Sequence, residues 1–329
     1  MKSVGLDRIS SVGEQGYFLP RRLAHVNLYV GNLDKTMDFY TNTLGFQEVY
    51  RTPLHGGGFV SNGNTHHDIG FIDANGPFKE KIKKEIRAGE LYHLGFELES
   101  ERALVDGYER ATADGVKFVR TADHDIAHSV YGEDADGITY ELYADVIKDW
   151  RTHRTGIVTK PKPNWAPGST PVVEEPLYHT DVEYARIEHA IFHPLRTTHA
   201  VLAVTDLATS VSYYTDVIGL ELDPLSAGKN YAILLGNLGT PALVLHQACE
   251  GLTAGYKHVC VEVASLQELG ESVTKAREAG LSLVSDVFHA GRRAVIVADP
   301  DGNQVCFYAD DGSDRSITEV DDDLAFRIL

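Results

Sequence analysis

The chain has 329 residues, 43% of them hydrophobic, which is enough for a sizeable core and suggests two domains. A formal net charge of −18 argues against a nucleic-acid partner, because phosphates would be repelled. No apolar run approaches a membrane span, and the first 20 residues lack the apolar core of a secretory signal. The three cysteines, Cys249, Cys260 and Cys306, imply no disulfide framework, so we expect a cytoplasmic protein without a membrane partner.

The first predicted element is a strand at 23–30 in which apolar and polar residues alternate. The alternation places His25 on the face opposite to Ala24 and Val26. A helix follows and ends at Gly45. This helix covers residues near 33–44. The elements predicted after it are strands near 46–52, 57–63, 66–73 and 92–100, a helix near 102–114, and strands near 116–121, 127–132 and 138–144.

Three of these strands carry side chains that could bind a metal. The dipeptide Asp136-Gly137 predicts a hairpin that brings Tyr131 next to Glu141 on paired antiparallel strands. A carboxylate in the middle of a strand is costly to bury unless it is paired or bound to a metal. His25, His93 and Glu141 have the composition of a facial triad that leaves coordination positions open. Each histidine alone is more typical of a hydrogen-bonded structural residue.

An internal repeat determines the organisation of the chain. His25 recurs as His199 at an offset of 174, and His93 recurs as His258 at an offset of 165. The turn segment DADGITYELYAD also returns, as DPDGNQVCFYAD. The expected divisions are an N-terminal extension at 1–21, a domain with the metal site at 22–146, a proline-containing connector at 147–196, a degenerate structural copy at 197–311 and an acidic tail at 312–329.

Four segments follow one another in the first copy, and they read HVNLYVGNLDKTMDFYTNTLGF, HHDIGF, YHLGFELES and DHDIAHSVYGEDADGITYELYAD. They resemble the successive signatures of the type I extradiol ring-cleavage dioxygenases of the vicinal oxygen chelate superfamily. The resemblance covers nearly all of residues 22–146.

The resemblance implies an α+β fold in which tandem βαβββ modules form two half-barrel domains. It also implies a non-haem Fe(II) enzyme that uses O2 to cleave a catecholic ring next to its two hydroxyls. The iron ligands would be His25, His93 and Glu141. Mn(II) is an alternative metal, because the ligand preferences of the two ions overlap.

The resemblance also implies three catalytic residues around the metal. His67 would take a proton from the substrate hydroxyl and later return one, since an imidazole titrates in the right range. Tyr131 would hydrogen-bond a substrate oxygen, and His124 would contact the catecholate. We expect His66 to point to the opposite face as a structural or surface residue, and His128 to be a bystander.

The second copy departs from the pattern. Many two-domain members of the family carry the working site in the C-terminal copy, whereas in this chain Cys306 and Ile296 replace the carboxylate and the tyrosine there. His199, His258 and Cys306 could bind a soft metal. We expect a vestigial, structural copy, because the carboxylate and the surrounding proton-transfer groups are missing.

Two other classes of function remain open. One is a glyoxalase, epimerase or thiol transferase, in which the metal acts only as a Lewis acid. The other is a non-catalytic ligand-binding or resistance protein on the same fold. The combination of His67, His124 and Tyr131 favours the dioxygenase over both.

Two segments lack a counterpart in this scheme. The mixed-charge run at 79–87 is typical of a solvated helix or loop, with a lid over the site as the alternative. The end of the tail, which includes Leu324 and Phe326, is apolar and could dock on its own subunit or on a neighbour. We expect a homo-oligomer.

Overall fold

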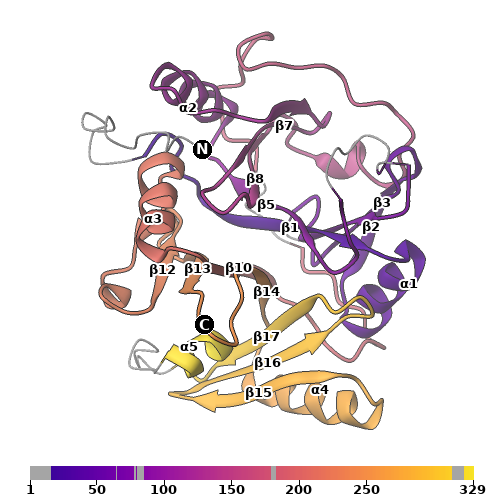
Figure 1. The fold of residues 1–329 in the computed structure, drawn as a ribbon. Helices are drawn as coiled ribbons and strands as arrows, with labels where there is room; N and C mark the ends of the chain where they lie inside the picture. The colour runs from indigo at the N-terminus through magenta and orange to yellow at the C-terminus, as the bar shows by residue number, and fades with distance from the viewer. Residues whose placement is uncertain (1–15, 64, 78, 80–84, 179–182, 313–321) are drawn as a thin grey trace.

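The computed structural model describes residues 16–63, 65–77, 79, 85–178, 183–312 and 322–329. Two mixed sheets, one per copy of the repeat, lie one above the other, with the first copy in indigo to magenta and the second in orange to yellow (Figure 1). None of the helices in the described ranges is long and apolar enough to cross a bilayer. The α+β prediction of two duplicated domains is confirmed.

The first copy contains two βαβββ units in succession. Their elements are β1 (Arg22–Val30), α1 (Leu33–Asp38), β2 (Gln47–Thr52), β3 (Gly57–Ser61), β4 (Ile69–Asp73), β5 (Leu91–Glu97), α2 (Glu101–Ala113), β6 (Arg120–Asp123), β7 (Ala127–Glu133) and β8 (Thr139–Asp145). Asn32 and Ser100 cap the two helices through their side chains. The predicted helix at 33–44 is α-helical only to Asp38 and continues as a π-helical turn, η1 (Phe39–Thr43).

The second copy repeats this order, as the internal repeat predicts. Its elements are β10 (Arg196–Val204), α3 (Leu207–Ser212), η5 (Tyr213–Ile218), β11 (Glu221–Leu222), β12 (Tyr231–Leu235), β13 (Pro241–Gln247), β14 (Gly255–Glu262), α4 (Leu266–Glu278), β15 (Leu283–His289), β16 (Arg292–Ala298) and β17 (Gln304–Asp310). Short 3-10 turns are η2 (Pro53–His55), η4 (Trp150–Thr152) and η6 (Pro224–Ser226).

The order of strands puts the functional strands in the middle of the first sheet. That order is β6-β7-β8-β5-β1-β4-β3-β2-β9, and in the second sheet it is β11-β12-β13-β10-β14-β17-β16-β15. The apolar face of β1 joins a continuous core with the helices, through residues such as Val26, Leu28 and Met37. The predicted alternation is wrong at Ala24. A β-bulge between Leu23 and His25 places Leu23 rather than Ala24 in this core.

The hairpin turns of each copy bind the other copy. The hydroxyl of Tyr214 donates to the buried carboxylate of Asp134 at 2.9 Å, and that of Tyr40 donates to Asp299 at 3.3 Å. Asp136 likewise accepts from the backbone N–H of Thr205 at 2.8 Å. The aspartates of these turns therefore hold the two halves together.

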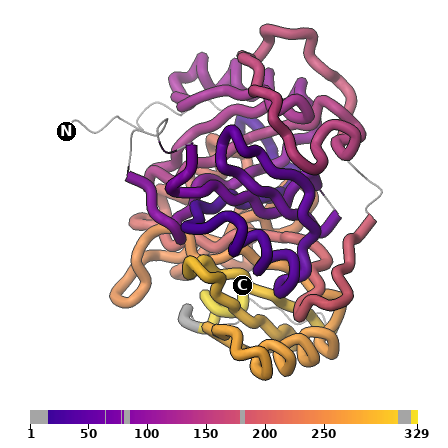
Figure 2. Tube along the Cα trace, turned by 90° about the vertical axis from the view of Figure 1, so that its right-hand side faces the viewer, coloured from indigo at the N-terminus to yellow at the C-terminus, as the bar shows by residue number. Residues whose placement is uncertain are grey.

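The connector is more ordered than its prolines suggest. β9 (Gly156–Ile157) lies within it and pairs with β2, which extends the first sheet by one strand. Trp150 and Trp165 are buried, so parts of the connector pack against the rest of the chain. Figure 2 shows the connector, in pink, on the outside of the molecule.

The two remaining segments have different outcomes. Most of the run at 79–87 lies outside the described residues, so its role as a lid stays a prediction. Within the tail, residues 313–321 also lie outside the described part. The final helix, α5 (Asp322–Ile328), docks on the second sheet of its own chain, where Ala325 and Ile328 are buried.

Candidate active site

Four adjacent strands line up the central residues of the site. His25 on β1 is opposite Gly95 on β5, Gly95 is next to Glu141 on β8, and Glu141 is opposite Tyr131 on β7. All four therefore share one row and one face of the sheet. His93 lies two residues before Gly95, which puts it on the same face.

Gly95 makes the convergence of side chains over this row feasible. A Cβ at this position would lie only 2.1 Å from Nε2 of His25. Without that Cβ, His25 extends across β5 and reaches Glu141 on the far side. The strand pattern alone did not predict this requirement, although a glycine between two polar residues on one face of a strand is a signal for close approach.

The structure brings His25, His93 and Glu141 together. Oε2 of Glu141 lies 2.9 Å from Nε2 of His25 and 3.0 Å from Nε2 of His93. The two imidazole nitrogens lie 3.3 Å apart, and all three side chains are buried. Two imidazole nitrogens that face each other and one carboxylate oxygen form a donor set that fits a divalent cation.

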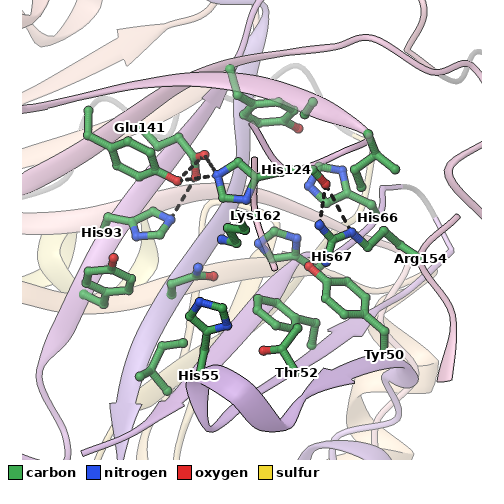
Figure 3. A pocket seen from close by; sticks show the side chains of 18 of the residues that line it. Tyr50, Thr52, His55, His66, His67, His93, His124, Glu141, Arg154 and Lys162 are labelled. Atoms are coloured by element: carbon green, nitrogen blue, oxygen red, sulfur yellow. Dashed lines mark hydrogen bonds and ion pairs between the residues drawn. The ribbon is translucent and has the colours of Figure 1, made fainter. Parts of the chain in front are cut away.

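The second oxygen of Glu141 belongs to a hydrogen-bond network. The hydroxyl of Tyr131 donates to Oε1 of Glu141 at 2.5 Å, and Nε2 of His124 lies 2.9 Å from the same hydroxyl. Burial opposes ionisation of Glu141, but the surrounding histidines outweigh it and hold its pKa well below the ordinary value. Burial raises the pKa of Tyr131 well above 10, so this phenol remains a hydrogen-bond donor. Figure 3 shows His93, His124 and Glu141 pointing toward one another.

His67 lies against the ligand cluster. Its ring centroid is 4.1 Å from that of His25, and neither of its buried nitrogens has a hydrogen-bond partner among the described residues. Burial lowers the pKa of His67 well below 6.5, and the nearby His25 lowers it further. The residue is thus a neutral imidazole with a lone pair available inside the pocket.

The prediction for His66 is wrong. His66 is buried, lines the same pocket and lies 4.6 Å from His67 between ring centroids. Strand alternation fails here because β4 begins only at Ile69, so residues 65–68 follow an irregular path. His128, by contrast, is outside the pocket, where it bonds Glu101 at 2.6 Å and stacks on Trp165.

Three cationic side chains that the sequence pattern did not predict also line the pocket. Arg120 comes from the start of β6. Arg154 and Lys162 come from the connector (Figure 3). The complete lining is Asn27, Tyr50, Thr52, His55, Phe59, His66, His67, Ile72, Tyr92, His93, Arg120, His124, Ile126, Ala127, Tyr131, Glu141, Tyr143, Arg154 and Lys162. The available signal was the cluster of basic residues around the prolines of the connector.

The second copy has the same row of positions with different chemistry. His199 is opposite Cys260, Cys260 is next to Cys306, and Cys306 is opposite Ile296. Cys260 therefore occupies the place of the glycine in the first copy, and Nε2 of His199 bonds the carbonyl of Leu329 at 2.9 Å.

The final helix of the chain occupies part of the second hollow. Phe326 and Leu329 pack into it, next to residues that include Cys260 and Cys306. The group that could hold a soft metal is His258, Cys260 and Cys306, rather than the predicted set with His199.

Comparison with known proteins places this architecture in a family. Residues 22–142 and 196–307 match the model of the Glyoxalase/Bleomycin resistance protein/Dioxygenase superfamily, which covers more than half of the chain. The chain belongs to this superfamily. Superfamily membership accounts for the duplicated half-barrels but leaves the reaction open, because one fold supports several chemistries.

Individual relatives within the superfamily are distant. The chain is 26% identical over 211 residues to the catechol-2,3-dioxygenase of Bacillus subtilis. The aligned region covers 63% of this chain and 68% of that protein. Alignments to three further curated relatives span 40%, 42% and 63% of those proteins. The solved structures with a similar fold include the Mn(II)-bound glyoxalase from Novosphingobium aromaticivorans, at a TM-score of 0.63 and 15% identity, with 93% of this chain and 85% of that chain covered. The 2,3-dioxygenase LapB from Pseudomonas sp. KL28 has a TM-score of 0.63 at 18% identity, with 89% and 93% covered.

Proposed function

We propose that the protein is a non-haem iron extradiol dioxygenase, which cleaves a catecholic ring beside its two hydroxyls with incorporation of O2. One observation carries the proposal. A cluster of two histidines and one carboxylate shares its pocket with His67, His124 and Tyr131, three groups that can hold or move protons. A Lewis-acid isomerase would have little use for this combination. The relative named catechol-2,3-dioxygenase supports the same class of reaction.

His25, His93 and Glu141 are the proposed iron ligands. Their donor atoms converge within 3.3 Å of one another. Fe(II) at this position would supply a path for electrons between the aromatic ring and O2. Mn(II) fits the same donors and is the alternative metal.

The other three residues act on the substrate. His67 is the proposed general base and acid, because it is neutral, buried and without a partner among the described residues. His124 and Tyr131 lie 2.9 Å apart and would bind the substrate oxygen that chelates the metal. Both are held in place by Glu141, so their positions depend on the carboxylate that also serves the metal.

The test is oxygen consumption by anaerobically purified, iron-loaded protein with a panel of catechols. A ring-opened hydroxymuconic semialdehyde or ketone, yellow at neutral to alkaline pH, should form with stoichiometric oxygen uptake and without an external reductant. His93→Ala provides the control, since it removes a proposed ligand. A colourless muconate would indicate cleavage between the hydroxyls and contradict the proposal. Absence of oxygen uptake across the whole panel would favour the Lewis-acid alternative.

A further inference from the structure

The pocket holds more positive charge than its own carboxylate can offset. Arg120, Arg154 and Lys162 line it, and Glu141 is the only carboxylate among the described lining residues. Arg154 has an ion-pair partner outside the pocket, because its Nη2 lies 3.3 Å from Oδ2 of Asp125, a carboxylate that it shares with Lys160. Neither Arg120 nor Lys162 has a carboxylate within ion-pair distance among the described residues.

The contacts of Arg120 place its charge close to the proposed metal ligands. Its guanidinium carbon lies 3.7 Å from the centroid of the Tyr131 ring, and its Nη2 donates to the hydroxyl of Tyr92 at 2.9 Å. The hydroxyl of Tyr131 contacts Glu141 directly. One tyrosine ring therefore separates the guanidinium from the ligand cluster. A substituent on a catechol bound at the cluster can span the width of that ring and reach the guanidinium.

Lys162 lines the same pocket from a different segment of the chain. It belongs to the connector and reaches into the pocket beside His124 (Figure 3). The neighbouring Lys160 differs, since its ammonium bonds Asp125 at 2.6 Å and does not line the pocket. Two lysines only two residues apart thus have distinct surroundings, one paired and one exposed toward the pocket.

A catechol whose ring substituent is uncharged would leave the charges of Arg120 and Lys162 unbalanced. Glu141 and an ionised catecholate would together offset a divalent ion at the triad, but the charges of Arg120 and Lys162 would remain. Like charges that converge in a narrow pocket repel, and an anionic ligand group between them relieves this repulsion. A planar guanidinium matches the geometry of a carboxylate in particular.

We propose that Arg120 and Lys162 form an anion subsite, and that the preferred substrates are catechols that carry a carboxylate on a ring substituent. This inference rests on the proposed function, because it places the catechol at the triad. The subsite determines which catechol binds, while the triad and its proton-transfer groups determine the reaction.

Binding and turnover are measured separately so that the two proposals can fail independently. Isothermal titration of iron-loaded, anaerobic full-length protein compares 3,4-dihydroxyphenylacetate with 4-ethylcatechol, and 2,3-dihydroxybenzoate with 3-methylcatechol. In at least one pair, the wild-type protein should bind the acid about tenfold or more tightly than the neutral partner. Lys162→Met and Arg120→Met should weaken binding of that acid by roughly 10- to 100-fold, and binding of the neutral catechol by less than about threefold.

Lys160→Met is the matched control and should leave both affinities unchanged. Equal wild-type affinity within both pairs would overturn the subsite, as would a loss in Lys160→Met equal to that in Lys162→Met. A variant that weakens acid and neutral catechol alike would also overturn it, because the residue would then act through general packing. If acids bind tightly but no catechol consumes oxygen, the proposed reaction fails while the subsite stands.

Discussion

Gly95→Ala tests the geometry of the site with the smallest possible change. The added Cβ would lie 2.1 Å from Nε2 of His25, 2.2 Å from its Cε1 and 2.5 Å from its Cδ2. Ordinary contacts begin at 3.4 Å, so the imidazole must withdraw by more than about 1 Å. Metal–ligand distances tolerate only about 0.2 Å. His25 should therefore be lost as a ligand.

The expected loss of iron affinity is at least about 100-fold, since even changes outside the ligand set cost roughly 10- to 100-fold. Competition with a chromophoric chelator, under anaerobic conditions, measures this affinity. Circular dichroism of the metal-free variant shows whether it still folds, because overpacking in a strand costs about 1–3 kcal/mol. Gly270→Ala is the control: in α4 its Cβ would meet only the end of the Arg293 side chain, at 3.4 Å. This control should keep the metal.

A double variant separates displacement of His25 from general damage. If Gly95→Ala acts through the imidazole, adding His25→Ala should cause no further loss of affinity, because the ligand is already gone. Additive losses would mean that the alanine disturbs the site by another route. Wild-type iron affinity in Gly95→Ala would refute the assignment of His25 as a ligand in the observed orientation.

Three further variants test other parts of the structure. His67→Gln should keep iron and bind catechol but lower turnover by about 10²- to 10⁴-fold; loss of iron would make His67 a ligand, and an unchanged rate would remove its proposed role. His258→Ala should leave the iron content at one ion per chain by metal analysis, and a metal-free product would show that the second copy holds the ion. Tyr214→Phe should lower the free energy of unfolding by about 1–3 kcal/mol in denaturant titration, because it leaves the buried carboxylate of Asp134 without its phenol partner. An unchanged midpoint would show that this contact between the halves is not stabilising.

The sequence predicts the strands and the candidate ligands for the same physical reason. A strand has a period of two residues, so a polar position in an apolar alternation identifies one face. The hairpin at Asp136-Gly137 then fixes the register that brings Tyr131 opposite Glu141, as observed. These features depend on neighbours in sequence or on one turn, which is why a single chain suffices to predict them.

Features that depend on the path of irregular segments could not be predicted in this way. His66 faces the pocket because residues 65–68 precede β4, and no periodicity applies to them. Lys162 lines the pocket because the connector crosses the mouth of the first half, a route set by tertiary packing of Trp150 and Trp165. The docking of α5 is determined by the shape of a hollow that exists only after the second sheet has formed.

One strand position explains why the two halves of a duplicated chain differ in chemistry. In the first half this position is Gly95, and the absence of a side chain lets His25 meet Glu141 across the strand. In the second half it is Cys260, whose side chain stands between His199 and Cys306. His199 then bonds the carbonyl of Leu329 instead, and α5 occupies part of the hollow. A Cys260→Gly change alone would restore the space but not a carboxylate ligand, so the second half lacks two separate requirements of the first.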